Sequence, residues 1–284
     1  MQKIKQSHIS FLFQKKNSSK VSFISGILII VLLSITFLGT WNLISNELFN
    51  SWSKLSVEQL KYLTQNRIFP EVASSFWQRA LTFTYISNFA AGILLIIFAF
   101  CKNKKAISNI LTISITYITI TFLVFWGLVF PSILKDIKNS SNQKSYWWFV
   151  FTTIIHFINP MIAIVAFVLI KKDLVVSKYV IYWAFIFIFI YYLFALSTFF
   201  IGEKVTNIYL NNPQLKQELK EINIFSSTKT TIYAFLNFKH PLFYKGNSLF
   251  AIVGLNLLIF ILGSILAIGI TWTWIKVLKI KKYN

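Results

Sequence analysis

The chain has 284 residues, of which 56% are hydrophobic, 18% are aromatic and only 13% are charged. A soluble domain carries about 25% charged residues, so this composition excludes an ordinary soluble domain and indicates an integral membrane protein. The net charge of +20 comes from 28 basic and 8 acidic residues. The lysines lie between apolar stretches, where anionic headgroups attract them, so we expect membrane lipids as partners and no nucleic acid.

Six stretches are long and apolar enough to cross a membrane, since a spanning helix needs about 20 mostly apolar residues. The first is too long for the apolar core of a secretory signal and lacks a small-residue cleavage site, so we expect it to be retained. We therefore predict an all-α polytopic integral membrane protein, a bundle of six transmembrane helices that forms one domain over residues 1–284. The spans are roughly 22–44, 80–101, 107–131, 147–170, 179–201 and 248–274.

The distribution of charge predicts the orientation of the chain. The two terminal segments and the loops 102–106 and 171–178 carry fifteen basic residues and one acid in 44 positions. The other connections carry thirteen basic and seven acidic residues in 96 positions. Basic residues in short loops mark the cytoplasmic side. Both termini should therefore be cytoplasmic, and the two long loops, 45–79 and 202–247, should be extracytoplasmic. The abundance of Lys, Ile, Phe and Asn is typical of an AT-rich bacterial genome, so we expect a multi-pass protein of a bacterial cell membrane.

Each long loop contains a pattern that favours a short amphipathic helix. In 53–64, the run from Ser56 to Gln59 has the spacing of a capping box. In 212–225, Asn212 and Pro213 precede an apolar stripe at helical spacing. An ordinary folded loop remains an alternative for both segments.

The spans contain no Asp, Glu, Lys or Arg. Coupled transporters and proton pumps usually place ionisable groups at mid-membrane, so the absence argues against that class. The few polar side chains inside the spans stand out for the same reason. From their distances to the span centres, several lie in one layer towards the outer side, on four different helices. The members of this layer are Thr84, Asn88, His156, Asn159, Tyr192 and Asn256.

Most polar side chains in membrane helices pack against a neighbouring helix by hydrogen bonding. We expect this role for the stripe of Thr112, Thr116 and Thr119, and it is an alternative for Asn88 and Asn256. His156 differs because it is the one group in the spans that titrates below pH 8. One histidine without a carboxylate or thiolate at that depth cannot supply three metal ligands, and Cys101 is the single cysteine. We therefore expect no metal and no cofactor.

Three short motifs resemble those of a prokaryotic six-helix membrane family of unknown function. They are Phe83–Asn88, which reads F-T-x-x-S-N, His156–Pro160, which reads H-x-x-x-P, and Asn256 after a Pro-aromatic stretch. That family is distantly similar to the androgen-induced membrane proteins, which hydrolyse lipid esters with an intramembrane threonine and histidine. The resemblance implies Thr84 as the nucleophile and His156 as the base. Ser87 stands where the eukaryotic proteins have an Asp.

Such a hydrolase needs a hydroxyl, a base within hydrogen-bond reach and donors for the oxyanion. A neutral His156 could activate Thr84, and Asn88, Asn159 or Tyr192 could stabilise the oxyanion, with Asn256 as a further substrate contact. Two other classes stay open. One is a non-catalytic scaffold or complex subunit that binds an extracytoplasmic protein partner through its long loops. The other is a transporter of lipids or small solutes. The oligomeric state is not predictable from these features.

Overall fold

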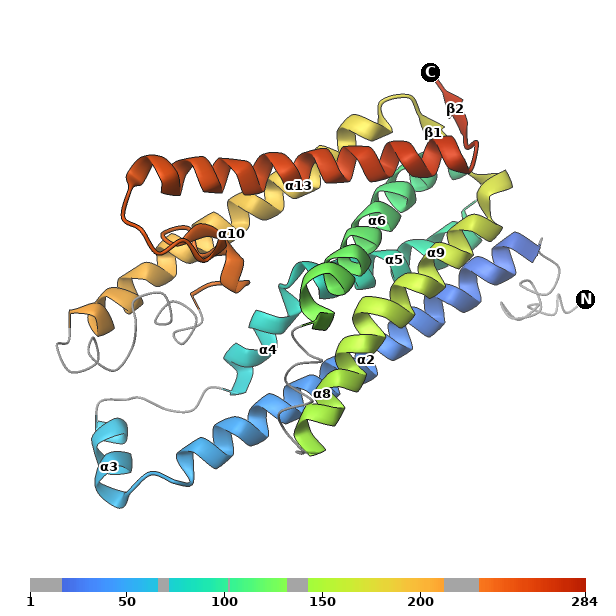
Figure 1. Ribbon diagram of the computed structural model, residues 1–284. Helices are drawn as coiled ribbons and strands as arrows, with labels where there is room; N and C mark the ends of the chain where they lie inside the picture. The colour runs from blue at the N-terminus through green and yellow to red at the C-terminus, as the bar shows by residue number, and fades with distance from the viewer. Residues whose placement is uncertain (1–16, 66–71, 102, 132–142, 212–229) are drawn as a thin grey trace, which may run out of the picture. The chain divides into compact units, whose positions relative to one another are not determined.

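The computed structural model describes residues 17–65, 72–101, 103–131, 143–211 and 230–284 (Figure 1). Within these ranges, six helices are long and apolar enough to span a membrane. The predicted fold class, an all-α polytopic membrane protein with six spanning helices, is therefore confirmed. The six candidate spans are Asn17–Trp52, Phe83–Phe100, Lys104–Gly127, Tyr146–Leu169, Val180–Lys204 and Leu249–Val277.

The chain divides into two compact units. The first unit comprises residues 1–178 and 274–284, and the second comprises residues 179–273. The first contains four of the candidate spans, and the second contains the last two apart from the final residues of the sixth. That the six spans form one domain stays a prediction.

The first unit is a bundle of helices around α2 (Asn17–Trp52) and α5 (Phe83–Phe100), which contact each other along much of their lengths. Their backbones approach closely where two glycines meet. A Cβ atom at Gly26 would lie only 2.7 Å from the carbonyl oxygen of Gly92. Small residues at such a crossing allow close van der Waals packing, which is the main attraction between helices in a membrane.

The other helices of this bundle are α6 (Lys104–Val124) and a long interrupted helix that comprises α8, η2 and α9. Helix α6 packs on α5 and α9, and α2 contacts α8, η2 and α9. Figure 1 shows α8 and α9 in yellow-green, in line with each other beside α2. Its parts are α8 (Gln143–Thr153), the π-helical turn η2 (Ile154–Ile158) and α9 (Asn159–Leu169).

Hydroxyl side chains join or line these helices. Ser22 on α2 donates to the carbonyl of Leu95 on α5 at 2.7 Å. The hydroxyls of the α6 threonine stripe donate to carbonyls one turn back on the same helix. The predicted hydrogen bonding to a neighbouring helix is confirmed for Thr119, which also accepts from the indole N–H of Trp274 at 3.1 Å. Each hydroxyl is thereby satisfied without water.

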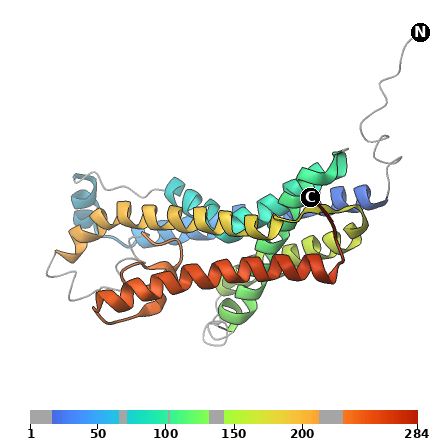
Figure 2. The same ribbon diagram turned by 90° about the horizontal axis from the view of Figure 1, so that it is seen from above.

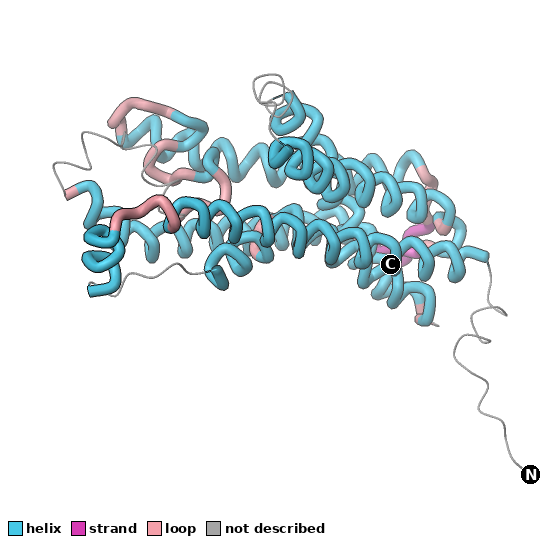
Figure 3. Tube along the Cα trace, turned by 90° about the horizontal axis from the view of Figure 1, so that it is seen from below, coloured by secondary structure: helices cyan, strands magenta, loops and turns pink. Residues whose placement is uncertain are grey.

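A small parallel sheet closes one end of the first unit, and no sequence pattern predicted it. Strand β1 (Val175–Ser177) pairs with β2 (Lys281–Tyr283) near the C-terminus (Figure 3). Asn109 on α6 holds both strands, because its side chain accepts from the N–H of Ser177 at 2.7 Å and donates to the Tyr283 hydroxyl at 2.8 Å. Between α9 and β1 lies the single 3-10 turn η3 (Lys171–Asp173).

The long loop after α2 contains two short helices. The predicted capping box is confirmed at α3 (Val57–Gln65). The N–H of Ser56 donates to the Gln59 side chain at 2.9 Å, and the N–H of Gln59 donates to the Ser56 hydroxyl at 3.1 Å. Helix α4 (Val72–Ala80) was not predicted, and it takes the first residue of the span expected at 80–101. The helix expected at 212–225 lies outside the described residues.

The second unit consists of α10 (Val180–Leu210), α13 (Leu249–Val277) as far as Thr273, and the loop between them (Figure 2). The described part of this loop holds the 3-10 turns η4 (Ala234–Leu236) and η5 (Pro241–Phe243). Leu236 and Phe238 of the loop pack with Ala195 and Phe199 of α10. The loop thereby covers an apolar stripe of the helix.

Candidate functional site

Two π-helical turns in the first unit have the same cause in the sequence. The turn η1 (Phe125–Val129) ends two residues before Pro131, and η2 ends two residues before Pro160. In η2 the N–H of Asn159 donates to the carbonyl of Ile154, five residues back. The next carbonyl, that of Ile155, would need the N–H of residue 160 in this register, and proline has none. The proline therefore leaves the Ile155 carbonyl without a backbone donor.

Asn88 on α5 supplies that donor. Its side-chain amide donates to the Ile155 carbonyl at 3.0 Å and to the Thr84 carbonyl on its own helix at 2.8 Å. Asn88 is fully buried. Two of the motifs noted in the sequence, the Asn of F-T-x-x-S-N and the Pro of H-x-x-x-P, thus meet in one contact. This contact joins α5 to η2 at the level of His156.

The His156 ring lies between η2 and the end of α6. It stacks on Phe125 with ring centroids 5.3 Å apart and an interplanar angle of 14°. The ring hydrogen-bonds to the backbone of Thr121, and its buried Nδ1 has no hydrogen-bond partner. The bonded nitrogen is therefore Nε2, which donates to a carbonyl, and we assign the tautomer with the proton on Nε2. Nδ1 then presents a lone pair and can accept a proton.

The packing of α5 against α6 brings two more hydroxyls to this level. Ser87 Oγ and Thr121 Oγ1 lie 3.0 Å apart, and Ser87 also donates to the Thr84 carbonyl at 3.0 Å. Thr84 is buried on the same side of α5 as Ser87 and Asn88. Because Nδ1 of His156 has no partner, the Thr84 hydroxyl does not donate to it in this arrangement. Thr84 lies one turn, about 6 Å, along α5 from Asn88.

Asn159 is the first residue of α9, directly after η2, and is also fully buried. Its side-chain N–H donates to the Ile29 carbonyl of α2 at 3.4 Å, which is long for a hydrogen bond. Its Oδ1 has no hydrogen-bond partner. Both amide hydrogens of Asn88 are engaged, so an oxyanion could bond to Asn88 only by displacing one of them. Asn159 is the more loosely held amide of the two.

Several buried side-chain atoms of the first unit have no hydrogen-bond partner. Among the described residues, the side-chain atoms of the unit that are buried without a hydrogen-bond partner include Oδ1 of Asn88, Nδ1 of His156, Oδ1 of Asn159 and the hydroxyl oxygens of Thr36 and Thr153. A buried polar atom without a partner costs about 1–3 kcal/mol. Amide oxygens and an unprotonated imidazole nitrogen accept hydrogen bonds. Nδ1 of His156 and the two amide oxygens can therefore each accept a further hydrogen bond.

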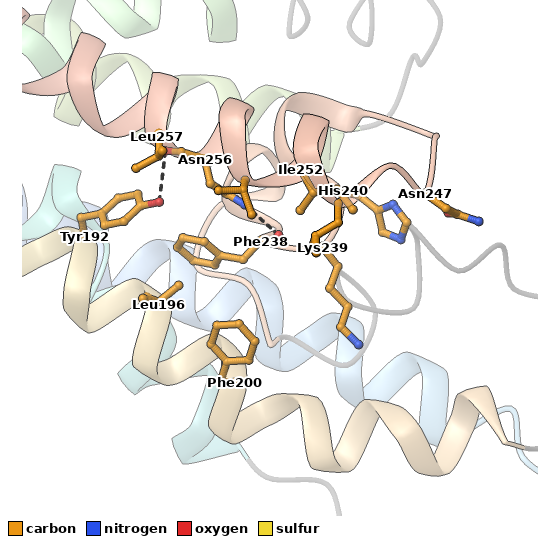
Figure 4. A pocket seen from close by; sticks show the side chains of 12 residues that line it. Tyr192, Leu196, Phe200, Phe238, Lys239, His240, Asn247, Ile252, Asn256 and Leu257 are labelled. Carbon is orange, nitrogen blue, oxygen red and sulfur yellow. Dashed lines mark hydrogen bonds between the residues drawn. The ribbon is translucent and has the colours of Figure 1, made fainter.

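The other two predicted residues, Tyr192 and Asn256, belong to the second unit. The Tyr192 hydroxyl donates to the Asn256 carbonyl at 3.1 Å, and the Asn256 side chain donates to the Phe238 carbonyl at 2.8 Å (Figure 4). These bonds tie α10, α13 and the connecting loop together. Tyr192 and Asn256 also line a cavity of about 520 Å³ in this unit.

The structure therefore brings Asn88, His156 and the Thr84 backbone into one region and ties Tyr192 to Asn256 in another. The sequence did not single out Thr121 or Thr153. Thr153 precedes His156 by three residues, so the helical repeat could have placed it near the histidine. The Thr121 contact depends on how α6 packs against η2, which no local pattern encodes. Within the described ranges, no three His, Cys, Asp or Glu side chains cluster as metal ligands would.

No family model matches the chain, and no curated protein or solved structure is similar enough to count as a match. The resemblance to the six-helix family therefore stays an inference from three short motifs.

Proposed function

We propose that the first unit is an intramembrane hydrolase of lipid esters, with His156 as general base and Thr84 as nucleophile. The observation that carries the proposal is the buried, unpartnered Nδ1 of His156. The ring is held by stacking on Phe125 and by its bond to the Thr121 backbone, so Nδ1 is presented in a defined direction. A positioned imidazole with a free lone pair is the group that general-base catalysis requires.

The chemistry uses an ester and one water molecule. Thr84 Oγ1 attacks the ester carbonyl while its proton passes to Nδ1 of His156, and the C–O bond to the alcohol breaks as that proton is returned to the leaving oxygen. Water then attacks the acyl-threonine while Nδ1 again accepts a proton. The bond between the acyl carbon and Thr84 Oγ1 breaks, the proton returns from Nδ1 to Oγ1, and the fatty acid leaves. Asn159, whose amide is the less firmly bonded, donates to the oxyanion. Attack requires the Thr84 hydroxyl to approach Nδ1, since catalytic hydrogen bonds often form only in the substrate complex.

The test is ester turnover by the purified, reconstituted protein. Thr84→Ala and His156→Ala should each reduce turnover of long-chain acyl esters by at least about 100-fold, because base catalysis alone contributes 10²–10⁴-fold. The double variant should be no worse than either single variant, because the two residues act as a unit. An acylating probe should label Thr84, and His156→Ala should suppress the labelling.

Three hydroxyl variants serve as controls. Thr82→Ala removes the cap of α5 but lies outside the site, so turnover should persist. Ser87→Ala and Thr153→Ala remove two of the other hydroxyls in this part of the unit. If one of these two variants lost turnover while Thr84→Ala kept it, the residue replaced in that variant would be the nucleophile, and Thr84 would not. Absence of turnover and labelling in the wild-type protein across a broad ester panel would end the hydrolase proposal.

A second candidate function is a non-catalytic membrane scaffold with an extracytoplasmic protein partner. It is favoured by one observation: both amide hydrogens of Asn88 are engaged, one with the Thr84 carbonyl of its own helix and one with the Ile155 carbonyl of η2. On this proposal the polar layer is packing, and the long loops carry the function. The ester assay separates the two candidates. For either candidate, we propose a bacterial cell membrane as the location and cytoplasmic termini, on the basis of the charge asymmetry.

A further inference from the structure

The cavity of the second unit has an elongated lining that follows one helix (Figure 4). Tyr192, Leu196 and Phe200 recur every four residues on α10 and form one wall. The opposite wall is the first part of α13, and Phe238 of the loop lies between them. The volume of about 520 Å³ is within the range of small-molecule sites.

The length of this wall matches one leaflet of a membrane. Glu203 lies eleven positions beyond Tyr192 on α10, a distance of about 16 Å along the helix. Half the hydrocarbon core of a bilayer is about 15 Å thick. The candidate span on α10 ends at Lys204, so Glu203 lies at the membrane boundary and Tyr192 lies towards the middle of the span. The cavity thus runs from the edge to the interior of the apolar layer.

The wall of the cavity that α13 forms has exposed apolar side chains. Leu249, Val253 and Leu257 are 74%, 50% and 54% exposed, although they line the cavity. In a membrane, such side chains face acyl chains and not water. The occupant that can enter from this side is therefore a lipid.

The lining of the cavity contains one positive charge, and its negative partner lies outside the lining. Lys239 lines the cavity, and its ammonium group forms an ion pair with the Glu203 carboxylate. Asn247 lines the same cavity and lies at the end away from Tyr192 in Figure 4. A purely anionic headgroup would be attracted by Lys239 and repelled by Glu203. A headgroup with both a phosphate and an ammonium group complements both residues at once.

We propose that this cavity binds one zwitterionic phospholipid whose headgroup carries a primary ammonium. The acyl chain lies along Leu196 and Phe200, the phosphate contacts Lys239, and the ammonium donates hydrogen bonds to Glu203. A primary ammonium is specified because it has hydrogens to donate to the carboxylate, which a quaternary ammonium lacks. The site is in the second unit and is independent of the proposed ester hydrolysis.

The experiment uses the full chain in nanodiscs that contain a photoreactive, diazirine-labelled phosphatidylethanolamine. Crosslinks should map to α10 near Leu196 and to α13 near Val253. Unlabelled phosphatidylethanolamine should compete at least about tenfold better than phosphatidylcholine, phosphatidylglycerol or diacylglycerol. Leu196→Trp should fill the cavity and reduce crosslinking at least tenfold. Ile201→Trp is the matched control, because Ile201 is 72% exposed on α10 and does not line the cavity.

Glu203→Gln provides a second readout that does not change the cavity's shape. It removes the partner of the ammonium and leaves Lys239 unpaired, so the preference should shift towards phosphatidylglycerol. Two results together would overturn the site: equal crosslinking of all the lipids, and no change in crosslinking on Leu196→Trp. They would show that only bulk lipid contacts this surface. A wild-type preference for phosphatidylglycerol or phosphatidylcholine would overturn the assignment of the headgroup.

Discussion

Replacement of Asn88 by leucine tests whether this residue compensates for Pro160. The leucine keeps the volume of the side chain but cannot donate to the Ile155 carbonyl, which accepts from Asn88 at 3.0 Å. A hydrogen bond between membrane helices contributes about 0.6–1.7 kcal/mol, and a buried polar group left unsatisfied costs about 1–3 kcal/mol. We expect Asn88→Leu to lower the free energy of unfolding by about 2 kcal/mol.

Pro160→Ala should reduce that cost. Alanine restores a backbone N–H at position 160, which can donate to the Ile155 carbonyl in the π-helical register or allow a regular α-helical turn. In the Pro160→Ala background we therefore expect Asn88→Leu to cost less than about 1 kcal/mol. The coupling of about 1 kcal/mol is within the range for residues that share a partner.

The assay is reversible unfolding in mixed micelles with increasing dodecyl sulfate, followed by circular dichroism for the four proteins of the double-mutant cycle. Ser22→Ala is the matched control. It removes another bond from a side chain to a carbonyl across the α2–α5 contact, at 2.7 Å, and should be additive with Pro160→Ala within about 0.5 kcal/mol. Strict additivity of Asn88→Leu and Pro160→Ala would refute the link between the proline and the asparagine.

Two further predictions concern orientation and packing. In a cysteine-free background, Ser56→Cys should react with an impermeant thiol reagent on intact cells and Lys172→Cys should not; the reverse pattern would invert the proposed topology. Gly26→Ala should destabilise the protein by about 1–3 kcal/mol, because the added Cβ would lie 2.7 Å from a carbonyl oxygen of α5. Gly127→Ala, where nothing lies within 4 Å of the added atom, should be neutral or slightly stabilising in the same unfolding assay, and equal losses would contradict the packing argument.

The six spans were predictable because membrane insertion depends on the summed apolarity of about 20 consecutive residues. The capping box at Ser56 was predictable for a similar reason, since its donors and acceptors lie within four residues of each other. Span ends were less accurate. Helix α2 runs from Asn17 to Trp52, beyond the predicted 22–44, because polar residues continue a helix once its apolar part has formed. The strand pair β1–β2 joins segments more than a hundred residues apart, so no local pattern indicated it.

The candidate site was partly predictable. Scarcity alone identified His156, Asn88 and Asn159, because polar side chains are conspicuous in apolar helices. The partners of these residues were not predictable. The sequence placed Tyr192 and Asn256 in the same polar layer as His156, since depth along a span can be counted. Depth along a span does not tell which helices face one another. The structure shows that Tyr192 and Asn256 hydrogen-bond to each other within the second unit.

The sequence by itself determined that this protein is an all-α membrane protein with six spanning helices, because apolar length and charge distribution act locally along the chain. Only the tertiary structure decided what the polar residues do. Pro160 removes a backbone donor, which is a local effect, but the side chain that replaces it comes from Asn88, 72 positions earlier on another helix. That pairing exists because the Gly26–Gly92 crossing and the α5–α6 contact fix the positions of the helices. Helix packing depends on how well the surfaces of two helices fit each other, so the sequence of one helix alone does not predict its partner.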